Sequence, residues 1–242
     1  MSDVLLAVPS KGRLEQATRE TLAEFGLVIT RPGGDRSYLG AIEGLDGVTV
    51  RFISASEIAR ELVRGRIDIG VTGLDVLHEA APAAPDQVIT AKALGFGHAD
   101  VVVAAPASWI DVETMSDLAD VASDFRHRHG RWLRVATKFV NLTRRFFADH
   151  GIAEYRIVES LGSTEAAPSA GAADLIVDIT STGSTLKANG LRVPSDGLIL
   201  PSQASLIVSR QAAWDAGRRA IVEAFLDKVE QGLGASVAAE LR

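Results

Sequence analysis

The chain has 242 residues, of which 47% are hydrophobic and 23% charged, so it can bury a globular core in one large domain or two small ones. Its net charge of −6 argues against a nucleic-acid partner bound by overall electrostatic attraction. The absence of cysteine excludes disulfides, thiolate nucleophiles and cysteine-based zinc sites. No window approaches a membrane span of ~18 apolar residues, and the N-terminal residues lack a signal peptide's basic segment, so we expect a cytoplasmic protein without membrane association.

Strand-like apolar runs alternate with helical spacing along the whole chain. In chain order, we predict strands at 4–8, 48–53, 67–71, 101–105, 133–137, 155–158, 175–178, 198–200 and 206–208. The intervening helices are predicted at 14–25, 56–64, 75–80, 115–125, 140–150 and 165–170, with a long terminal helix at 212–233. This alternation predicts an α/β fold with mostly parallel sheets and helices on both faces.

The most informative segment follows the apolar run at 175–177. Asp178 stands at the tip of that predicted strand, and five hydroxyl residues around one glycine follow it: Thr180, Ser181, Thr182, Gly183, Ser184 and Thr185. Backbone N–H groups and hydroxyls at such a strand-to-helix loop can bind a phosphate. Asp178 is placed to bind sugar hydroxyls, because ligands of parallel sheets lie beyond the strand C-termini. The pair suggests a phosphoribosyl group; the alternative is a turn that only caps a helix.

A second candidate loop, at 9–14, joins the first predicted strand to the first helix. Gly12 permits close backbone approach, and Lys11 and Arg13 supply two cations beside the free N–H groups of the helix start. These features are typical of an anion site. A solvated basic turn that caps the helix explains the same residues equally well.

Three further segments carry weaker signals. Residues 136–141 lead from a strand into a helix, where Lys138 or Asn141 could contact a ligand or the helix start could simply be capped. Residues 69–75 contain two glycines after a strand, which favours a tight turn over a ligand loop. The basic run at 126–131 resembles a metal or phosphate site, but its alternating charges favour a solvated surface loop, and no histidine has the spacing of a zinc site.

Together these segments closely resemble the ATP phosphoribosyltransferase family. The family signature runs from a Glu through a Gly to an acid and a Thr-Gly-x-Thr loop, and residues 165–186 fill every fixed position. The Ser-Lys-Gly-Arg loop at 10–13, Asp-Ile-Gly-Val-Thr-Gly at 68–73, Ala-Thr-Lys-Phe-Val-Asn at 136–141 and Lys-Ala-Asn-Gly-Leu at 187–191 also match. The resemblance covers nearly the whole chain in the right order.

The resemblance implies a fold like that of periplasmic binding proteins, with two α/β lobes and ligands between them. The first lobe is expected to comprise residues 1–104 and 190–242, and the second residues 105–189. The implied reaction joins ATP and phosphoribosyl pyrophosphate, with Mg²⁺, to give N1-(5-phosphoribosyl)-ATP and pyrophosphate. No metal bound by the protein alone is expected.

Residue by residue, the resemblance gives these positions roles. Thr180 to Thr185 would bind the 5-phosphate, Asp178 and Glu165 would face the ribose hydroxyls, and Lys138 would contact the substrate. Lys11 and Arg13 would reach the pyrophosphate or the ATP phosphates, with Arg36 as a further candidate. One position departs from the family: many members have an arginine for the leaving pyrophosphate where this chain has Ser54. Arg51, Arg60 or another cation would then compensate, or Mg²⁺ and Lys11 would carry more of that work.

Length implies a form of the enzyme within the family. Long forms add a C-terminal regulatory domain, whereas this chain ends soon after its terminal helix and resembles the short form. Short forms work with a histidyl-tRNA-synthetase-like regulatory subunit, which implies a homodimer within a hetero-oligomer. A solute-binding protein would normally need export, porphobilinogen deaminase needs a cysteine, and a ligand sensor would not need both the 10–13 and 180–185 loops.

Overall fold

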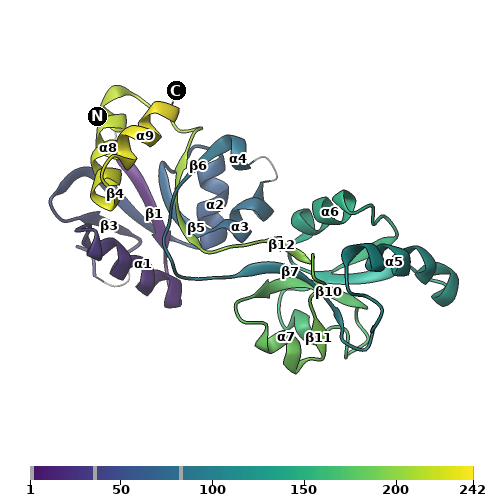
Figure 1. Cartoon of the computed structure of the whole chain (residues 1–242). Coiled ribbons are helices and arrows are strands. Elements are labelled where there is room, and N and C mark those ends of the chain that lie inside the picture. Colours follow the sequence, from purple (N-terminus) through teal and green to yellow (C-terminus); the bar gives the residue numbers. More distant parts are fainter. Residues whose placement is uncertain (1–2, 35–36, 82–83, 242) are drawn as a thin grey trace. The chain divides into compact units, whose positions relative to one another are not determined.

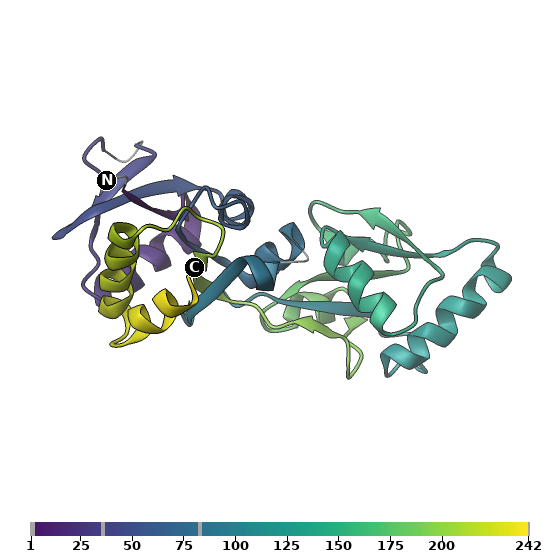
Figure 2. The same cartoon turned by 90° about the horizontal axis from the view of Figure 1, so that it is seen from above.

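The computed structural model describes residues 3–34, 37–81 and 84–241, and the chain divides into two compact units. Unit 1 comprises Met1–Gly97 and Gln203–Arg242, and unit 2 comprises His98–Ser202 (Figure 1). The chain passes between the units twice, at residues 97–98 and 202–203, and the two connecting segments run side by side in both views (Figures 1 and 2). Ala99 N in the first segment donates to Ser202 O in the second at 2.9 Å. Residues 98–104 and 190–202, expected in the first lobe, belong to unit 2 because their strands pair with the sheet of that unit.

Unit 1 is built on a seven-stranded sheet in the described part of the chain, with the strand order β2-β3-β4-β1-β5-β13-β6. Strand β1 pairs in parallel with β4 and β5, whereas β13 is antiparallel to β5 and β6. In chain order, the elements are β1 (Val4–Pro9), α1 (Gly12–Glu24), β2 (Ile29–Thr30), β3 (Leu39–Ile42), β4 (Leu45–Ile53), α2 (Ala55–Val63), β5 (Ile69–Gly73), α3 (Leu74–Ala80), α4 (Ala84–Gln87), β6 (Val88–Ala93), β13 (Ala204–Ser209), α8 (Ala216–Val229) and α9 (Leu233–Glu240).

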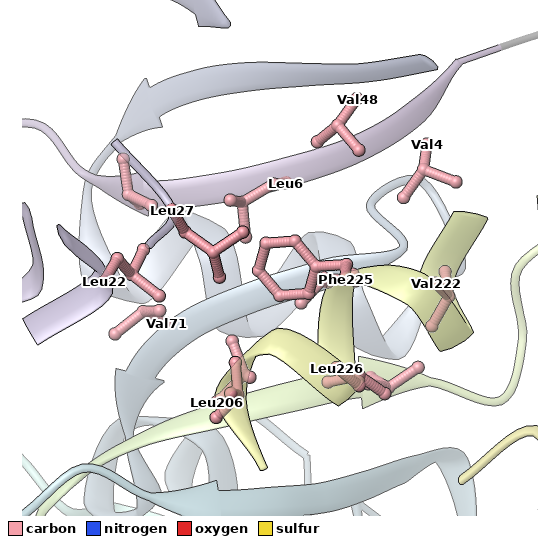
Figure 3. Close-up of a cluster of buried hydrophobic side chains, with 14 of the residues drawn as sticks. Val4, Leu6, Leu22, Leu27, Val48, Val71, Leu206, Val222, Phe225 and Leu226 are labelled. Carbon is pink, nitrogen blue, oxygen red and sulfur yellow. The ribbon is translucent and has the colours of Figure 1, made fainter. Parts of the chain in front are cut away.

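Helices cover both faces of this sheet, because side chains alternate between the faces along each strand. Leu6 of β1 faces the core beneath α1, α8 and α9, where Phe225 is fully buried (Figure 3). Ala7, the next residue, belongs to the opposite core with Ile58 of α2 and Leu77 of α3. Burying a side chain such as Phe225 stabilises the fold by roughly 1.5–3 kcal/mol. The C-terminal helices are therefore an integral part of unit 1.

Unit 2 contains a six-stranded sheet, again counted over the described residues, in the order β11-β7-β10-β8-β9 with β12 also paired to β7. Its face toward α5 and α6 buries Phe125 and Phe147, and its other face packs Ile176 against Leu186 of α7. The elements are β7 (Asp100–Pro106), α5 (Met115–His129), β8 (Leu133–Thr137), α6 (Val140–Asp149), β9 (Tyr155–Glu159), the 3-10 helix η1 (Thr164–Ala166), β10 (Leu175–Thr180), α7 (Ser184–Ala188), β11 (Leu191–Arg192) and β12 (Leu198–Leu200).

The α/β class, with helices on both faces of each sheet, is confirmed, but parallel pairing is less extensive than predicted. Over the part of the chain that the structure describes, parallel pairs occur only in the strand sets β4-β1-β5 and β10-β8-β9. Strands β7 and β13, the first after the chain passes from one unit to the other, run antiparallel to their neighbours in the sheets. Among the described residues, no helix is long and apolar enough to cross a bilayer.

Three helix predictions were wrong in extent. The helix expected at 165–170 is only the 3-10 helix η1, followed by turns. The terminal helix starts later, because the Asp215 side chain accepts from Arg218 N at 2.8 Å, and Gly232 (φ +84°) separates it from α9. Residues 126–129 of the basic run expected as a loop instead form the last turn of α5, which Gly130 ends at φ +63°. Phe125 and His129 stack there at 4.2 Å between ring centroids, which extends the helix to His129.

Candidate functional site

The candidate site lies where the parallel strands β8, β9 and β10 of unit 2 end. Thr137 of β8 stands opposite Val177 of β10 and Glu159 of β9, so the residues that follow these three, Lys138, Asp178 and Ser160, lie at one edge of the parallel strands. Strand β10 itself continues to Thr180, where among the described residues it pairs only with β7. The arrangement confirms the predicted strand-to-helix loop, since α7 begins at Ser184.

Asp178 is half-buried at this edge, and its environment raises the pKa of its carboxyl above the usual value. Burial is the main cause, and the nearby Glu165 carboxylate adds to it. Hydrogen bonds from the Ile179 amide (2.8 Å to Oδ1) and from Thr164, together with the charge of Lys138, act in the opposite direction. The ionised carboxylate is thus only partly compensated, which suits a group that receives donors from a ligand.

Thr164 belongs to this constellation and was missed by the sequence analysis. It is 2% exposed, and its hydroxyl makes a hydrogen bond to Asp178. Its Oγ1 also lies 3.0 Å from Ser160 Oγ, and Ser160 N donates to the carbonyl of Thr137 at 3.0 Å. No local pattern marks Thr164, because its partners Asp178 and Ser160 come from the ends of two different strands, β10 and β9.

The loop from Thr180 to Thr185, the hydroxyl loop, contains internal hydrogen bonds. Gly183 N donates to Thr180 Oγ1 at 2.8 Å, and the hydroxyls of Thr182 and Ser184 lie 2.9 Å apart. Gly183 has φ +73°, and a Cβ placed there would meet no described atom within 4 Å. Glycine is therefore required by the backbone conformation, and the space above it is open to a ligand.

Ser181 differs from the other hydroxyl residues of this loop. Its Oγ donates to the carbonyl of His98 at 2.8 Å, at the start of unit 2. Asp100 accepts the amide of Ser202 at 3.0 Å, and Phe96 packs against the core of unit 1. Phe96, the His98 carbonyl and Asp100 therefore have structural contacts in this segment.

The second predicted loop lies in unit 1, between β1 and α1. Lys11 occupies the N-cap position, and Lys11 and Arg13 are exposed. Neither forms an ion pair with another residue that the structure describes. Arg36, the further phosphate candidate, lies outside the described residues. Both cations are thus available to an anion.

The remaining candidate segments divide into structural and site residues. Ser54 accepts from Glu57 N at 3.3 Å and caps α2. Gly70 permits tight packing, because a Cβ there would lie 2.6 Å from Ile58 of α2. Thr137 Oγ1 accepts from Phe139 N at 2.8 Å, which caps the turn into α6, whereas Lys138 is brought close enough to act on Asp178.

The fold identifies the structural class to which the protein belongs. A solved histidine kinase sensor domain with similarity to periplasmic binding proteins has the same fold, with a TM-score of 0.51, 13% identity and coverage of 99% of this chain and 95% of that chain. The ATP phosphoribosyl transferase (HisG:HisZ) complex from Thermotoga maritima contains a chain with a TM-score of 0.69 and 29% identity, covering 96% of this chain and 98% of that chain. The chain therefore has the two-unit α/β fold of periplasmic binding proteins.

The particular family follows from sequence. The family described as HisG: ATP phosphoribosyltransferase matches residues 54–231. The ATP phosphoribosyltransferase of Chelativorans sp. is 60% identical over 221 residues, which span 91% of this chain and 96% of that protein. That of Bradyrhizobium sp. is 54% identical over 239 residues, or 99% of this chain and 74% of that protein. The chain belongs to the ATP phosphoribosyltransferase family and is a pentosyltransferase of histidine biosynthesis.

Proposed function

We propose that this enzyme transfers the 5-phosphoribosyl group of phosphoribosyl pyrophosphate to N1 of ATP and releases pyrophosphate, as the first step of histidine biosynthesis. The observation that carries this proposal is the position of Asp178 near the end of β10, two residues before the preformed loop at 180–185. A carboxylate and a neighbouring phosphate-binding loop would bind the ribose hydroxyls and the 5-phosphate of phosphoribosyl pyrophosphate, respectively.

Each side chain has a distinct part in this proposal. Thr180, Thr182, Ser184 and Thr185, with the backbone at Gly183, bind the 5-phosphate, and Ser181 positions the loop through its bond to His98. Asp178 and Glu165 bind the ribose hydroxyls. Lys138 balances their negative charge, and its effect on Asp178 supports this role.

The chemistry requires electrostatic stabilisation more than proton transfer. Adenine N1 already carries a lone pair, so its attack on the anomeric carbon needs no strong base. Breaking the bond to pyrophosphate leaves positive charge on the ribose and negative charge on the leaving group. Asp178 orients the ribose and stabilises the first charge, and Lys11 and Arg13 stabilise the second. Arg36 is proposed as a further phosphate ligand.

Mg²⁺ fits this donor set. Glu165 is close enough to Asp178 for its charge to disfavour the ionised form of the Asp178 carboxyl, and a divalent cation between substrate and protein would relieve that repulsion. When bound with the substrate phosphates, Mg²⁺ would neutralise charge that builds up on the pyrophosphate.

We further propose that the chain acts as a short-form catalytic subunit, a homodimer within a hetero-oligomer that includes a histidyl-tRNA-synthetase-like regulatory subunit. The support is its match to 98% of a chain from the HisG:HisZ complex of Thermotoga maritima. A location in the cytoplasm accords with this biosynthetic role.

The decisive experiment measures pyrophosphate release from ATP, phosphoribosyl pyrophosphate and Mg²⁺, with and without the synthetase-like subunit. We expect release that requires both substrates and rises when the subunit is added. Release from the isolated chain that the subunit leaves unchanged would contradict the short-form proposal. Ligand binding without release in either mixture would contradict the enzymatic proposal and favour a sensor of the same fold.

A further inference from the structure

A pocket of about 570 Å³ lies in unit 2, outside the candidate substrate site. One wall is the turn at 108–112 that follows β7, and the other is the face of α5 that carries Asp120, Val121 and Phe125. Asp174, at the pocket margin, immediately precedes β10, whereas the hydroxyl loop follows the opposite end of that strand. Because a strand rises ~3.3 Å per residue, the two sites are about 20 Å apart along β10.

The turn that forms the first wall is fixed in place. Arg192 Nη2 donates to the carbonyls of Trp109 (2.6 Å) and Ile110 (2.9 Å), and Ala107 N donates to Gly190 O at 2.7 Å. The rings of Trp109 and Phe125 lie 6.5 Å apart between centroids. Ile110, 72% exposed, extends this apolar surface at the rim. A preformed apolar wall lowers the entropic cost of binding a ligand.

The charges in the pocket are unevenly compensated. Arg131 donates to both carboxylate oxygens of Asp174, at 2.6 and 2.8 Å, and Arg128 forms an ion pair with Asp124. Both arginines are therefore neutralised by neighbours. Asp111 and Asp120 are exposed, and neither has a hydrogen bond or ion pair with another residue in the described ranges. The pocket thus combines an apolar wall with two carboxylates that lack cationic partners.

We propose that this pocket binds an organic cation with a flat apolar body, such as an amidinium or guanidinium group on an aromatic ring. The apolar body would contact Trp109, Ile110 and Val121, and the cationic group would donate hydrogen bonds to Asp111 and Asp120. Charge-assisted hydrogen bonds to carboxylates are the strong polar contacts available there. This inference stands apart from the proposed reaction, because it uses none of the residues assigned to substrate.

The test uses the full chain, labelled with ¹⁵N, and benzamidine as the probe, with benzamide as its uncharged counterpart. We expect saturable amide shifts in residues 108–112 and 120–125, and an affinity for benzamidine at least about tenfold greater than that for benzamide. The double variant Asp111→Asn/Asp120→Asn should lose about tenfold in benzamidine affinity. The control variant Asp149→Asn, at an exposed site on α6 outside the pocket, should bind like the parent.

Several outcomes would overturn the proposal. Equal affinity for benzamidine and benzamide would show that the carboxylates do not recognise the charge. Unchanged binding by the double variant would lead to the same conclusion. Because the substituted side chains are exposed, we expect the double variant to match the parent in thermal stability, so that a loss of binding would not reflect unfolding. Shifts confined to residues 137–139, 164–165 and 178–185 would assign the probe to the substrate site instead.

Discussion

Asp68, just before β5 in unit 1, and Asp178, within β10 in unit 2, differ in what compensates the charge of their carboxylates. Asp68 is 2% exposed, accepts Leu5 N at 2.7 Å and forms an ion pair with Arg218 of α8. Asp178 is half-buried and has partial compensation from Lys138 and Thr164. A buried carboxylate with a complete set of partners is costly to deprive of one of them, whereas one with an incomplete set is suited to receive a ligand.

The largest effect on stability should come from breaking the ion pair between Asp68 and Arg218. Arg218→Leu leaves Asp68 buried without its cation, and we expect the free energy of unfolding to fall by about 3–5 kcal/mol. Urea denaturation measures this loss. Arg64→Ala, which removes an exposed ion pair with Glu61, should cost less than about 1 kcal/mol. A small loss for Arg218→Leu would mean that the two carboxylates do not differ as described.

The next largest effect concerns turnover. Lys11→Ala removes an exposed cation proposed for the leaving pyrophosphate, and we expect kcat to fall at least ~10²-fold with the fold intact. Steady-state pyrophosphate release measures kcat, with Lys228→Ala on the exposed side of α8 as the control. Near-normal turnover would remove Lys11 from the mechanism.

Asp178→Asn should separate activity from stability. We expect kcat/KM for phosphoribosyl pyrophosphate to fall by about 10–10²-fold, because the charge beside the ribose is lost. The folded-state pKa of Asp178 is raised above 3.8, so its protonated form contributes stability that is complete below that value and is lost as the pH rises through the folded-state pKa. At pH 7 the variant should thus be at least as stable as the parent. A destabilised variant would make Asp178 structural, like Asp68.

Thr164→Val should have a smaller effect on the same carboxylate. Losing the hydroxyl raises the pKa of Asp178 further, so the acidic limb of the kcat/KM profile should move to higher pH, with a loss of about 3–10-fold at its lower end. Thr164→Ser, which keeps the hydroxyl, should restore the parent profile. A uniform loss of activity without a shift along the pH axis would indicate a packing defect instead.

The smallest effect on stability is expected at the hydroxyl loop. Gly183→Ala places a side chain at φ +73°, which should cost about 1–2 kcal/mol in thermal or urea unfolding. Gly162→Ala, in the same unit at an ordinary φ and in open space, should cost less. If Gly183→Ala keeps full affinity for phosphoribosyl pyrophosphate, the phosphate does not lie over this glycine.

The sequence by itself determined most of the local structure. Apolar runs and turn residues identified the strands that carry the site, because alternation and helical spacing are local properties. The loop at 180–185 and the cations at 11 and 13 were also visible as motifs, since their chemistry depends on neighbouring residues. Short edge strands such as β2 and β11 were missed, because two residues carry no periodicity.

Only the tertiary structure decided which of these residues act together. Thr164 reaches Asp178, Ser181 binds the carbonyl of His98, and Arg218 pairs with Asp68 across 150 residues of chain. Helix α8 packs on β1, from the opposite end of the sequence (Figure 3). Such partners are selected by the return of distant segments to one sheet edge or core, and no spacing along the chain encodes that return.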